Sequence, residues 1–205
     1  MSPVHLEAEY WDKLYRRHEY VYGTAPNQYL LRHASLFQPG MTAFVPGDGE
    51  GRNGVWLAKK GLQVVSAERS PWGVAKGMRL ARHHDVTVQF ECCDLLDWEW
   101  PQKQFDVAVA LYLHLQPRER KQVHRKLAHC LRPGGFVLLE AFKRSGRHSA
   151  KNSGRSDAAL YTTALLARDF QRFKILELLE NTVLMEEGPM HQGYAKVVRV
   201  LAQKR

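Results

Sequence analysis

A glycine-rich turn between a short apolar run and an amphipathic stretch constrains this chain more than any other feature. The run Ala43–Val45 is followed by Pro46 and by the segment Gly47–Gly51, in which glycine occupies every second position. Glycine lets the backbone adopt positive φ or lie flat against a ligand. The order of strand, glycine loop and helix is typical of a nucleotide-binding turn at the carboxyl end of a strand.

The spacing of the glycines distinguishes this loop from two common phosphate-binding loops. Gly47, Gly49 and Gly51 form G-x-G-x-G, whereas dinucleotide-binding enzymes carry G-x-G-x-x-G and the P-loop ends in Lys-Ser/Thr. A tight turn without a ligand would also explain the glycines alone. Glu68 favours a ligand, because it ends the next apolar run, Gln63–Ala67, where such folds keep a carboxylate for ribose hydroxyls. The glycine spacing disfavours a nicotinamide-dependent oxidoreductase.

Apolar runs alternate with amphipathic stretches, and this order predicts a parallel sheet flanked by helices. The predicted strands are Thr42–Val45, Gln63–Ala67, Val86–Glu91, Phe105–Leu111 and Phe136–Glu140. The predicted helices between them are Arg52–Lys60, Pro71–His83 with Ser70 as its cap, and Pro117–Leu131. Two further runs, Phe173–Met185 and His191–Ala202, should form an antiparallel hairpin. We therefore predict an α/β fold, Rossmann-like and doubly wound, with a mostly parallel seven-stranded sheet that ends in this hairpin.

The length fits one domain. A chain of 205 residues with 44% hydrophobic and 25% charged residues has the composition of an ordinary globular protein. We predict a single domain, 1–205, with an N-terminal helical cover (1–40), a cofactor-binding core (41–142), a mobile basic loop (143–156) and a C-terminal helix and hairpin (157–205). Within the cover, Asn27 should cap a helix that runs through Leu36.

The basic character of the chain is concentrated in one segment. The formal net charge is +9, and Lys143–Ser156 carries five basic residues and no acid, which leaves +4 for the rest. A single basic loop is weaker evidence for nucleic acid than a basic stripe on a folded face, so a nucleic-acid partner is not expected. No apolar run approaches the ~18 residues of a membrane span, and the first residues lack an apolar signal core. We expect a cytoplasmic protein, either monomer or homodimer, without a membrane partner.

The cysteines do not indicate a metal site or a disulfide framework. Cys92, Cys93 and Cys130 lack zinc-binding spacing, and adjacent cysteines do not readily bridge each other. We expect reduced thiols with structural roles and no bound metal.

Four stretches together resemble class I S-adenosylmethionine-dependent methyltransferases, from about Tyr10 to the C-terminus. They are Val45–Gly51, Val64–Glu68, Glu91–Leu95 and Leu131–Glu140. Within this class, the chain is similar to small bacterial enzymes of the tellurite-resistance and thiopurine methyltransferase type. The segments that carry this likeness are Trp11–Lys13, Tyr22–Gly23, Gly51–Asn53 and Trp56–Ala58. The Val-Pro-Gly form of the loop and the acid of the second strand also resemble thiol and halide methyltransferases.

The resemblance implies S-adenosylmethionine as the cofactor. The loop glycines would pass beneath its methionine part, and Glu68 would accept hydrogen bonds from both ribose hydroxyls. Asp94 would accept from the adenine amino group, Leu95 would donate its backbone N–H to the ring, and Leu111 would line the pocket near the sulfonium. The residues expected to contact the cofactor are Gly47, Asp48, Gly49, Gly51, Asn53, Glu68, Arg69, Asp94, Leu95 and Leu111.

The loop departs from the family pattern at two positions. Many members carry an acidic residue where Val45 stands, and a small residue where Asp48 stands. Asp48 would then either supply a carboxylate to the loop or change how the amino group of the cofactor is held. The departure concerns the affinity for the cofactor more than the fold.

The resemblance also implies a small, soft nucleophile as methyl acceptor: a thiol, a halide or a chalcogen oxyanion. The residues expected to bind the substrate are Trp11, Tyr22, Arg52 and His191. His114 and Tyr112, after the fourth strand, are the expected catalytic residues. His114 would take a thiol proton, with His191 as the second candidate. Tyr112, Tyr22 and Trp11 would offer aromatic faces to the cationic sulfonium.

Two other functions stay open. A nucleic-acid or protein methyltransferase is favoured only by the basic loop Lys143–Ser156. The chain lacks the Asn/Asp-Pro-Pro-aromatic signature that amino-group methylases usually carry after the fourth strand. A protein that binds S-adenosylmethionine without turnover would agree with the departures at Val45 and Asp48.

Overall fold

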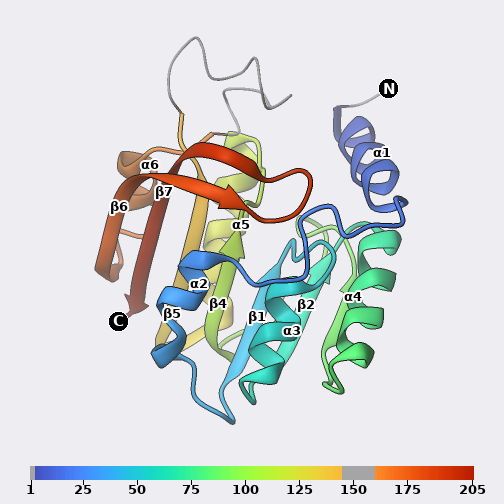
Figure 1. The fold of residues 1–205 in the computed structure, drawn as a ribbon. Coiled ribbons are helices and arrows are strands. Elements are labelled where there is room, and N and C mark those ends of the chain that lie inside the picture. The colour runs from blue at the N-terminus through green and yellow to red at the C-terminus, as the bar shows by residue number, and fades with distance from the viewer. Residues whose placement is uncertain (1–2, 145–159) are drawn as a thin grey trace. The chain divides into compact units, whose positions relative to one another are not determined.

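The computed structural model describes residues 3–144 and 160–205, and these form an α/β fold (Figure 1). Its helices are α1 (Pro3–Tyr15), α2 (Gln28–Arg32), α3 (Arg52–Lys59), α4 (Pro71–His83), α5 (Pro117–Cys130) and α6 (Thr163–Asp169), with a 3₁₀ turn, η1 (Ala34–Leu36). Its strands are β1 (Thr42–Pro46), β2 (Gln63–Glu68), β3 (Gln89–Cys92), β4 (Phe105–Leu111), β5 (Leu131–Phe142), β6 (Phe173–Glu186) and β7 (Gln192–Lys204).

The strands form one seven-stranded sheet in the order β3-β2-β1-β4-β5-β7-β6. β1 pairs in parallel with β2, β2 with β3, and β4 with β5, whereas β7 is antiparallel to β5. The predicted fold class, a mostly parallel Rossmann-like sheet with antiparallel strands at one end, is confirmed. No helix of the described residues is long and apolar enough to span a membrane.

The chain divides into two compact units, which we describe separately. The first contains Met1–Trp98 and Met185–Gly193, and the second contains Glu99–Leu184 and Tyr194–Arg205.

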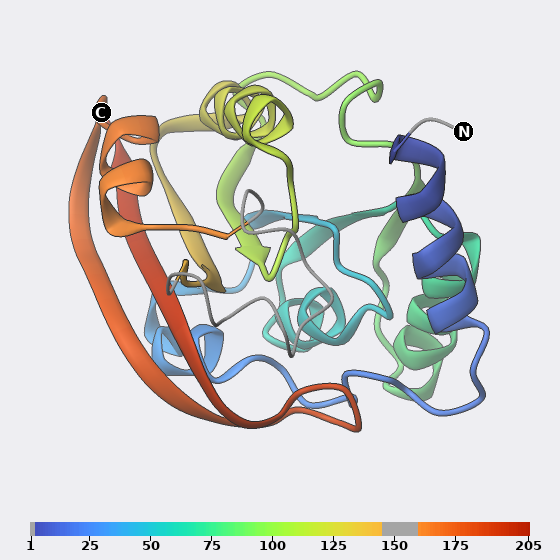
Figure 2. The ribbon, with the colours of Figure 1, turned by 90° about the horizontal axis from the view of Figure 1, so that it is seen from above.

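The first unit is built on β1, β2 and β3. Phe44 of β1 is fully buried and stacks on Trp98, with ring centroids 5.5 Å apart. On α3 the apolar Val55 and Leu57 are buried. Gly61 follows α3 with φ 87°, as predicted for the glycine that ends this helix. Figure 2 shows α1 alongside α4.

Two helix predictions in the first unit need correction. Asn27 caps α2 as expected, because its Oδ1 accepts from the N–H groups of Tyr29 and Leu30 at 2.8 and 3.1 Å. The helix does not continue to Leu36, however, since His33 leaves helical geometry (φ −101°, ψ 21°) and the chain goes on as η1. Ser70 stands at the N-cap of α4 without a capping bond.

The hydroxyl of Ser70 has a different partner. It donates to Oδ1 of Asp12 in α1, over 2.6 Å. Ser70 therefore ties two helices together instead of capping one.

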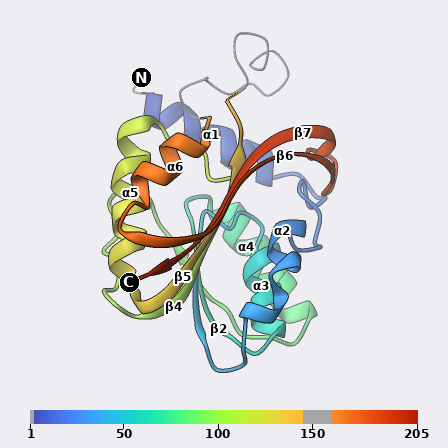
Figure 3. The same cartoon turned by 90° about the vertical axis from the view of Figure 1, so that its left-hand side faces the viewer.

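In the second unit β4 is almost entirely buried, as its continuous apolar run predicts. Pro117 opens α5, where Gln116 and Glu119 form a capping box. β5 is longer than predicted, because pairing with β4 begins at Leu131 and resumes after a register shift. β6 and β7 run side by side as two long strands (Figure 3).

Most of the basic segment, residues 145–156, lies outside the described residues. Of its basic side chains, that of Lys143 forms an ion pair with Glu180 on β6. The cysteines are free thiols, with Cys92 exposed and Cys130 buried.

Candidate functional site

The glycine loop Gly47–Gly51 has the backbone that its sequence predicts. Gly47, Gly49 and Gly51 have φ angles of 64°, 62° and 86°, in the left-handed region that glycine enters without strain. Gly51 is also the N-cap of α3. The chain thus passes from β1 to α3 through the loop alone, as in a nucleotide-binding turn.

Two loop glycines also leave room for a neighbour. A Cβ on Gly51 would lie 2.7 Å from Cα of Gly77 in α4. A Cβ on Gly49 would lie 2.6 Å from the hydroxyl of Tyr15, at the end of α1. Both distances are too short for real Cβ atoms, so only glycine at these two positions lets α1 and α4 pack this closely on the loop.

Asp48 directs its carboxylate into the protein. Its Oδ2 accepts from the Gly54 N–H at 3.1 Å and from the Ser66 hydroxyl at 2.9 Å. Its Oδ1 is buried and has no hydrogen-bond partner among residues 3–144 and 160–205. Burial raises the pKa of Asp48 to about 7, although the bonds from Ser66 and Gly54 oppose the shift. Asp48 anchors the loop to β2 and α3 and keeps one oxygen without a protein partner.

Glu68 ends β2 next to the glycine loop, as the sequence predicts. Its side chain is buried, with Oε2 accepting from the Gly49 N–H at 3.0 Å and Oε1 from the Ser70 N–H at 2.8 Å. Burial raises its pKa, and the backbone hydrogen bonds partly offset this effect. A carboxylate oxygen can accept more than one hydrogen bond, so Glu68 retains capacity for ligand hydroxyls.

The predicted adenine contacts lie after β3. Asp94 Oδ1 accepts from the Leu96 N–H at 2.9 Å, and its Oδ2 is 3.3 Å from Nη2 of Arg69. Leu95 is buried. Arg69 and Asp94, both predicted to contact the cofactor, are therefore brought together at the carboxyl ends of neighbouring strands.

A buried ion pair beside the loop was not predicted. Lys76 Nζ of α4 donates to Glu50 Oε1 and to the backbone oxygen of Glu19, both over 2.6 Å. The other oxygen of Glu50 accepts from the Tyr22 N–H at 3.4 Å. In the sequence, the only sign of this pair is that an acid, Glu50, stands between two loop glycines. Its partner Lys76 lies 26 residues further along the chain. Burial raises the pKa of Glu50, and Lys76 opposes the shift.

Arg52, predicted to bind substrate, forms a second buried ion pair. Its Nη2 is 2.8 Å from Oε2 of Glu187, and its Nη1 donates to the backbone oxygen of Ala25 at 3.3 Å. His191, also a predicted substrate residue, places Nδ1 3.2 Å from the same Glu187 oxygen. Burial alone would raise the pKa of Glu187, but hydrogen bonds from His191 and Arg52 lower it. The sequence prediction missed Glu187, which brings these two residues together.

The same part of the first unit holds Asn53, a predicted cofactor residue. Its Oδ1 accepts from the Asn27 N–H at 3.0 Å, and Asn27 Nδ2 donates to Oε1 of Glu187 at 3.2 Å. The N–H of Met190 donates to the backbone oxygen of Val21 at 3.0 Å. The turn Met185–Gly193 therefore packs against residues 21–27, next to the start of α3.

Aromatic residues line this N-terminal segment. Trp11 stacks on Tyr15, with ring centroids 5.6 Å apart, and Tyr15 meets Tyr22 edge-on at 6.5 Å. Tyr22 lies 4.3 Å from the ring of His191. Trp11 and Tyr22, predicted as substrate residues, thus belong to one aromatic group, and Tyr15, which was not predicted, lies at its centre.

The remaining predicted residues belong to the second unit. Leu111 ends β4 and is buried. Tyr112 follows with φ 53°, which is unusual for a non-glycine residue. Its N–H donates to the backbone oxygen of Glu140 at 2.8 Å. The rings of Tyr112 and His114 lie 4.7 and 5.9 Å from that of Phe142. Strained backbone of this kind is frequent at functional sites.

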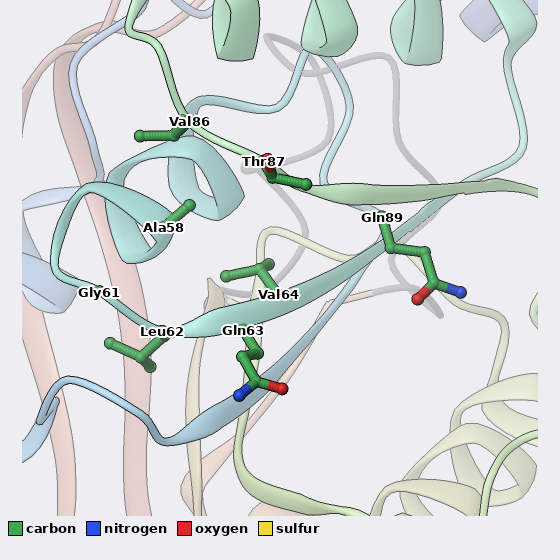
Figure 4. A pocket seen from close by; sticks show the side chains of 8 residues that line it. All are labelled: Ala58, Gly61, Leu62, Gln63, Val64, Val86, Thr87 and Gln89. Atoms are coloured by element: carbon green, nitrogen blue, oxygen red, sulfur yellow. The ribbon is translucent and has the colours of Figure 1, made fainter.

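Figure 4 shows one surface hollow of the first unit. It is lined by Ala58, Gly61, Leu62, Gln63, Val64, Val86, Thr87 and Gln89. These residues end α3, begin β2 and precede β3, so the hollow is at the amino ends of the strands. Open α/β sheets bind ligands at the carboxyl ends, and the hollow is therefore not the candidate site.

Comparison with known proteins identifies the central part of the chain. Residues 46–135 match a family of methyltransferase domains. No curated protein sequence matches the chain.

Several solved structures have a similar fold. A protein from a study of the conversion of a disulfide bond into a thioacetal group during echinomycin biosynthesis has a TM-score of 0.77 at 16% identity, over 97% of this chain and 92% of that one. TehB from Haemophilus influenzae has a TM-score of 0.72 at 15% identity, over 97% of this chain and 67% of that one. Geranyl diphosphate C-methyltransferase from Streptomyces coelicolor was solved with S-adenosylhomocysteine. It has a TM-score of 0.71 at 14% identity, over 100% of this chain and 99% of that one.

The match over residues 46–135 supports the predicted methyltransferase, and therefore an enzyme. At 14–16% identity the structural likeness describes the fold.

Proposed function

We propose that this chain transfers the methyl group of S-adenosylmethionine to a small, soft nucleophile: a thiol, a chalcogen oxyanion or a halide. The cofactor would lie on the glycine loop, with its ribose at Glu68 and its adenine beside Asp94 and Leu95. The left-handed glycine backbone of the loop and the spare accepting capacity of Glu68 fit such a ligand.

One observation supports a small acceptor over a polymer. Residues 19–25 are held beside the glycine loop at two points, through Lys76 at the Glu19 oxygen and through Arg52 at the Ala25 oxygen. Both cations also form buried ion pairs, with Glu50 and with Glu187. A chain segment fixed in this way next to the loop suits a covered site that admits small molecules and excludes water.

When bound, S-adenosylmethionine would supply an electrophilic methyl group on a cationic sulfur. The chain must then orient the acceptor and stabilise the positive charge. Trp11 and Tyr22 offer aromatic faces for the sulfonium. Holding the nucleophile in line at near-attack distance supplies much of the acceleration.

A protonated thiol also needs a base, whereas a halide does not. We assign this role to an imidazole nitrogen of His114, with Tyr112 beside it after β4. Histidine titrates near neutral pH and can accept a thiol proton. Arg52 and His191 remain proposed substrate residues, although each already contacts Glu187.

The test is a panel of acceptors, namely alkyl and aryl thiols, iodide, selenite and tellurite, assayed by release of S-adenosylhomocysteine. We expect turnover with at least one member, and none with RNA or a protein mixture. Activity on RNA alone, lost when residues 145–156 are deleted, would favour a nucleic-acid methyltransferase instead. Binding of the cofactor without turnover of any acceptor would favour a non-catalytic binding protein.

A matched pair of substrates tests the role of His114. His114→Gln should lower the rate with thiols by about 10²-fold or more and leave the rate with iodide, which carries no proton, within about twofold. Equal losses with both substrates would show that His114 does not act as the base.

A further inference from the structure

Tyr15 places a hydroxyl on the glycine loop. It is the last residue of α1 and is 5% exposed. A Cβ on Gly49 would lie 2.6 Å from its oxygen. Among residues 3–144 and 160–205 the hydroxyl has no hydrogen-bond partner, although its ring packs on those of Trp11 and Tyr22. The oxygen keeps a small contact with solvent, so a ligand that lies on the loop can reach it.

Glu68 lies next to this hydroxyl. The N–H of Gly49 donates to Glu68 Oε2 at 3.0 Å, so the same glycine contacts both side chains. In α4, a Cβ on Gly73 would lie 3.1 Å from Cδ2 of Tyr15 and 3.1 Å from Cγ of Glu68. An acid and a phenol therefore share the space between the loop and the start of α4.

The two groups have complementary hydrogen-bonding capacities. Burial, and then the negative charge of Glu68, raise the pKa of Tyr15 well above its usual value, so the phenol keeps its proton and can donate. An ionised carboxylate can only accept. No hydrogen bond joins Tyr15 and Glu68 within the described residues. A ligand hydroxyl, which both donates and accepts, would satisfy the two together.

We propose that Tyr15 is a cofactor-binding residue whose hydroxyl donates to the ribose of S-adenosylmethionine while Glu68 accepts from the same ribose. The inference rests on the proposed function, and it adds a residue of the N-terminal helix to the cofactor site. It also gives that helix a role in recognition of the adenosine, because the donor comes from α1 and the acceptor from β2.

Calorimetry with two ligands tests the proposal. S-adenosylhomocysteine carries both the ribose and the amino acid, whereas 5′-methylthioadenosine carries only the adenosine part. Tyr15→Phe keeps the ring and should raise the Kd of both ligands about three- to tenfold, the range of one lost hydrogen bond. Tyr10→Phe is the matched control, since Tyr10 is 52% exposed in the same helix, and should change neither Kd by more than about twofold.

Loss of affinity for S-adenosylhomocysteine alone would overturn the assignment to the ribose, because the hydroxyl would then serve the amino acid part. A Tyr15→Phe protein with unchanged Kd values would show that Tyr15 only packs. If wild-type protein bound neither ligand, the proposed function itself would fail. If Glu68→Ala weakened binding and Tyr15→Phe did not, only the present inference would fail.

A second measurement does not depend on how well Tyr15→Phe folds. Wild-type protein is titrated with 5′-methylthioadenosine and with its 2′-deoxy and 3′-deoxy forms. Removal of the hydroxyl that bridges Tyr15 and Glu68 should raise the Kd at least tenfold, because both protein groups lose a partner. Equal Kd values for all three ligands would contradict the proposal.

Discussion

Two groups of buried charges in this protein differ in how completely the protein satisfies them. Around the glycine loop, Asp48, Glu50 and Glu68 all have pKa values raised by burial. In the second unit, Asp169 accepts from Nε of Arg120 at 2.9 Å and faces Nδ1 of His124 at 3.0 Å. Burial would raise the pKa of Asp169, but hydrogen bonds from His124 and Arg120 lower it.

This difference distinguishes a ligand site from a cluster that only stabilises the fold. The α5–α6 cluster, Arg120, His124 and Asp169, contains its own counter-charges and links two helices. Near it, the Tyr161 hydroxyl donates to the Leu113 oxygen at 3.2 Å. The loop acids, Asp48, Glu50 and Glu68, are buried at a net cost, and Asp48 keeps an oxygen without a described partner. Acids with raised pKa values beside a conformationally special loop are typical of ligand sites.

The largest effect is expected from breaking the complete cluster. Asp169→Ala would leave Arg120 and His124 buried without their carboxylate, and should lower the free energy of unfolding by about 3–5 kcal/mol. Denaturant titration measures the change. Arg168→Ala is the control: its guanidinium is 3.7 Å from Asp169 but 56% exposed, so the loss should stay below about 1 kcal/mol. Equal losses would mean that burial does not distinguish these contacts.

A smaller loss is expected in the glycine loop. Gly51→Ala combines a left-handed φ of 86° with a Cβ that would lie 2.7 Å from the Gly77 backbone. We expect about 2–4 kcal/mol of destabilisation from strain and overpacking. Gly40→Ala has nearly the same φ, 88°, and no atom within 4 Å of the added Cβ, so only about 1–2 kcal/mol should be lost. Similar unfolding midpoints for the two variants would refute close packing of the loop on α4.

The pH dependence of stability should distinguish the two groups by sign. The pKa of Asp48 rises from 3.8 to about 7 on folding, so the folded state binds more protons between these values. Its contribution is present below about pH 4 and is lost as the pH rises towards 7, with a slope of at most about 1.4 kcal/mol per pH unit. Asp48→Asn should reduce the slope of the unfolding free energy at pH 4–7 by this amount, and the raised pKa values of Glu50 and Glu68 should leave a smaller slope of the same sign. An unchanged slope would show that Asp48 is ionised in the folded protein.

For Asp169 the sign is opposite. Its pKa is lowered on folding, so its contribution is present above its ordinary pKa and is lost as the pH falls through the folded value. Asp169→Asn should therefore flatten the acid side of the stability curve and leave the region of the Asp48 slope unchanged. A change confined to neutral pH would contradict this assignment.

The sequence predicts those parts of the molecule that local patterns determine. The alternation of apolar runs and turns placed β1, β2 and β4 correctly, and the loop glycines indicated left-handed backbone before α3. The positions of Glu68 and Asp94 could be predicted because Glu68 ends β2 and Asp94 lies two residues after β3. Ser70 was misassigned as a cap because its true partner, Asp12, lies on a different helix.

The rest depends on residues that are distant in the chain. Glu187 lies 135 positions from its partner Arg52, and no local pattern shows that an acid in a turn becomes buried. Lys76 similarly lies on the side of α4 that reaches Glu50 only after folding. In the sequence, Tyr15 is one of several apolar residues on a predicted amphipathic helix. Its contact with Gly49 depends on how α1 packs.

The most direct test of the account is calorimetry of the wild-type protein with S-adenosylmethionine, S-adenosylhomocysteine and NAD, repeated with Glu68→Ala. We predict binding of both adenosyl ligands and not of NAD. Glu68→Ala should weaken that binding by about 1.5–3 kcal/mol, the value of hydrogen bonds to a charged acceptor. No heat with either adenosyl ligand, or an affinity that Glu68→Ala leaves unchanged, would contradict the assignment of the glycine loop and Glu68 as the cofactor site.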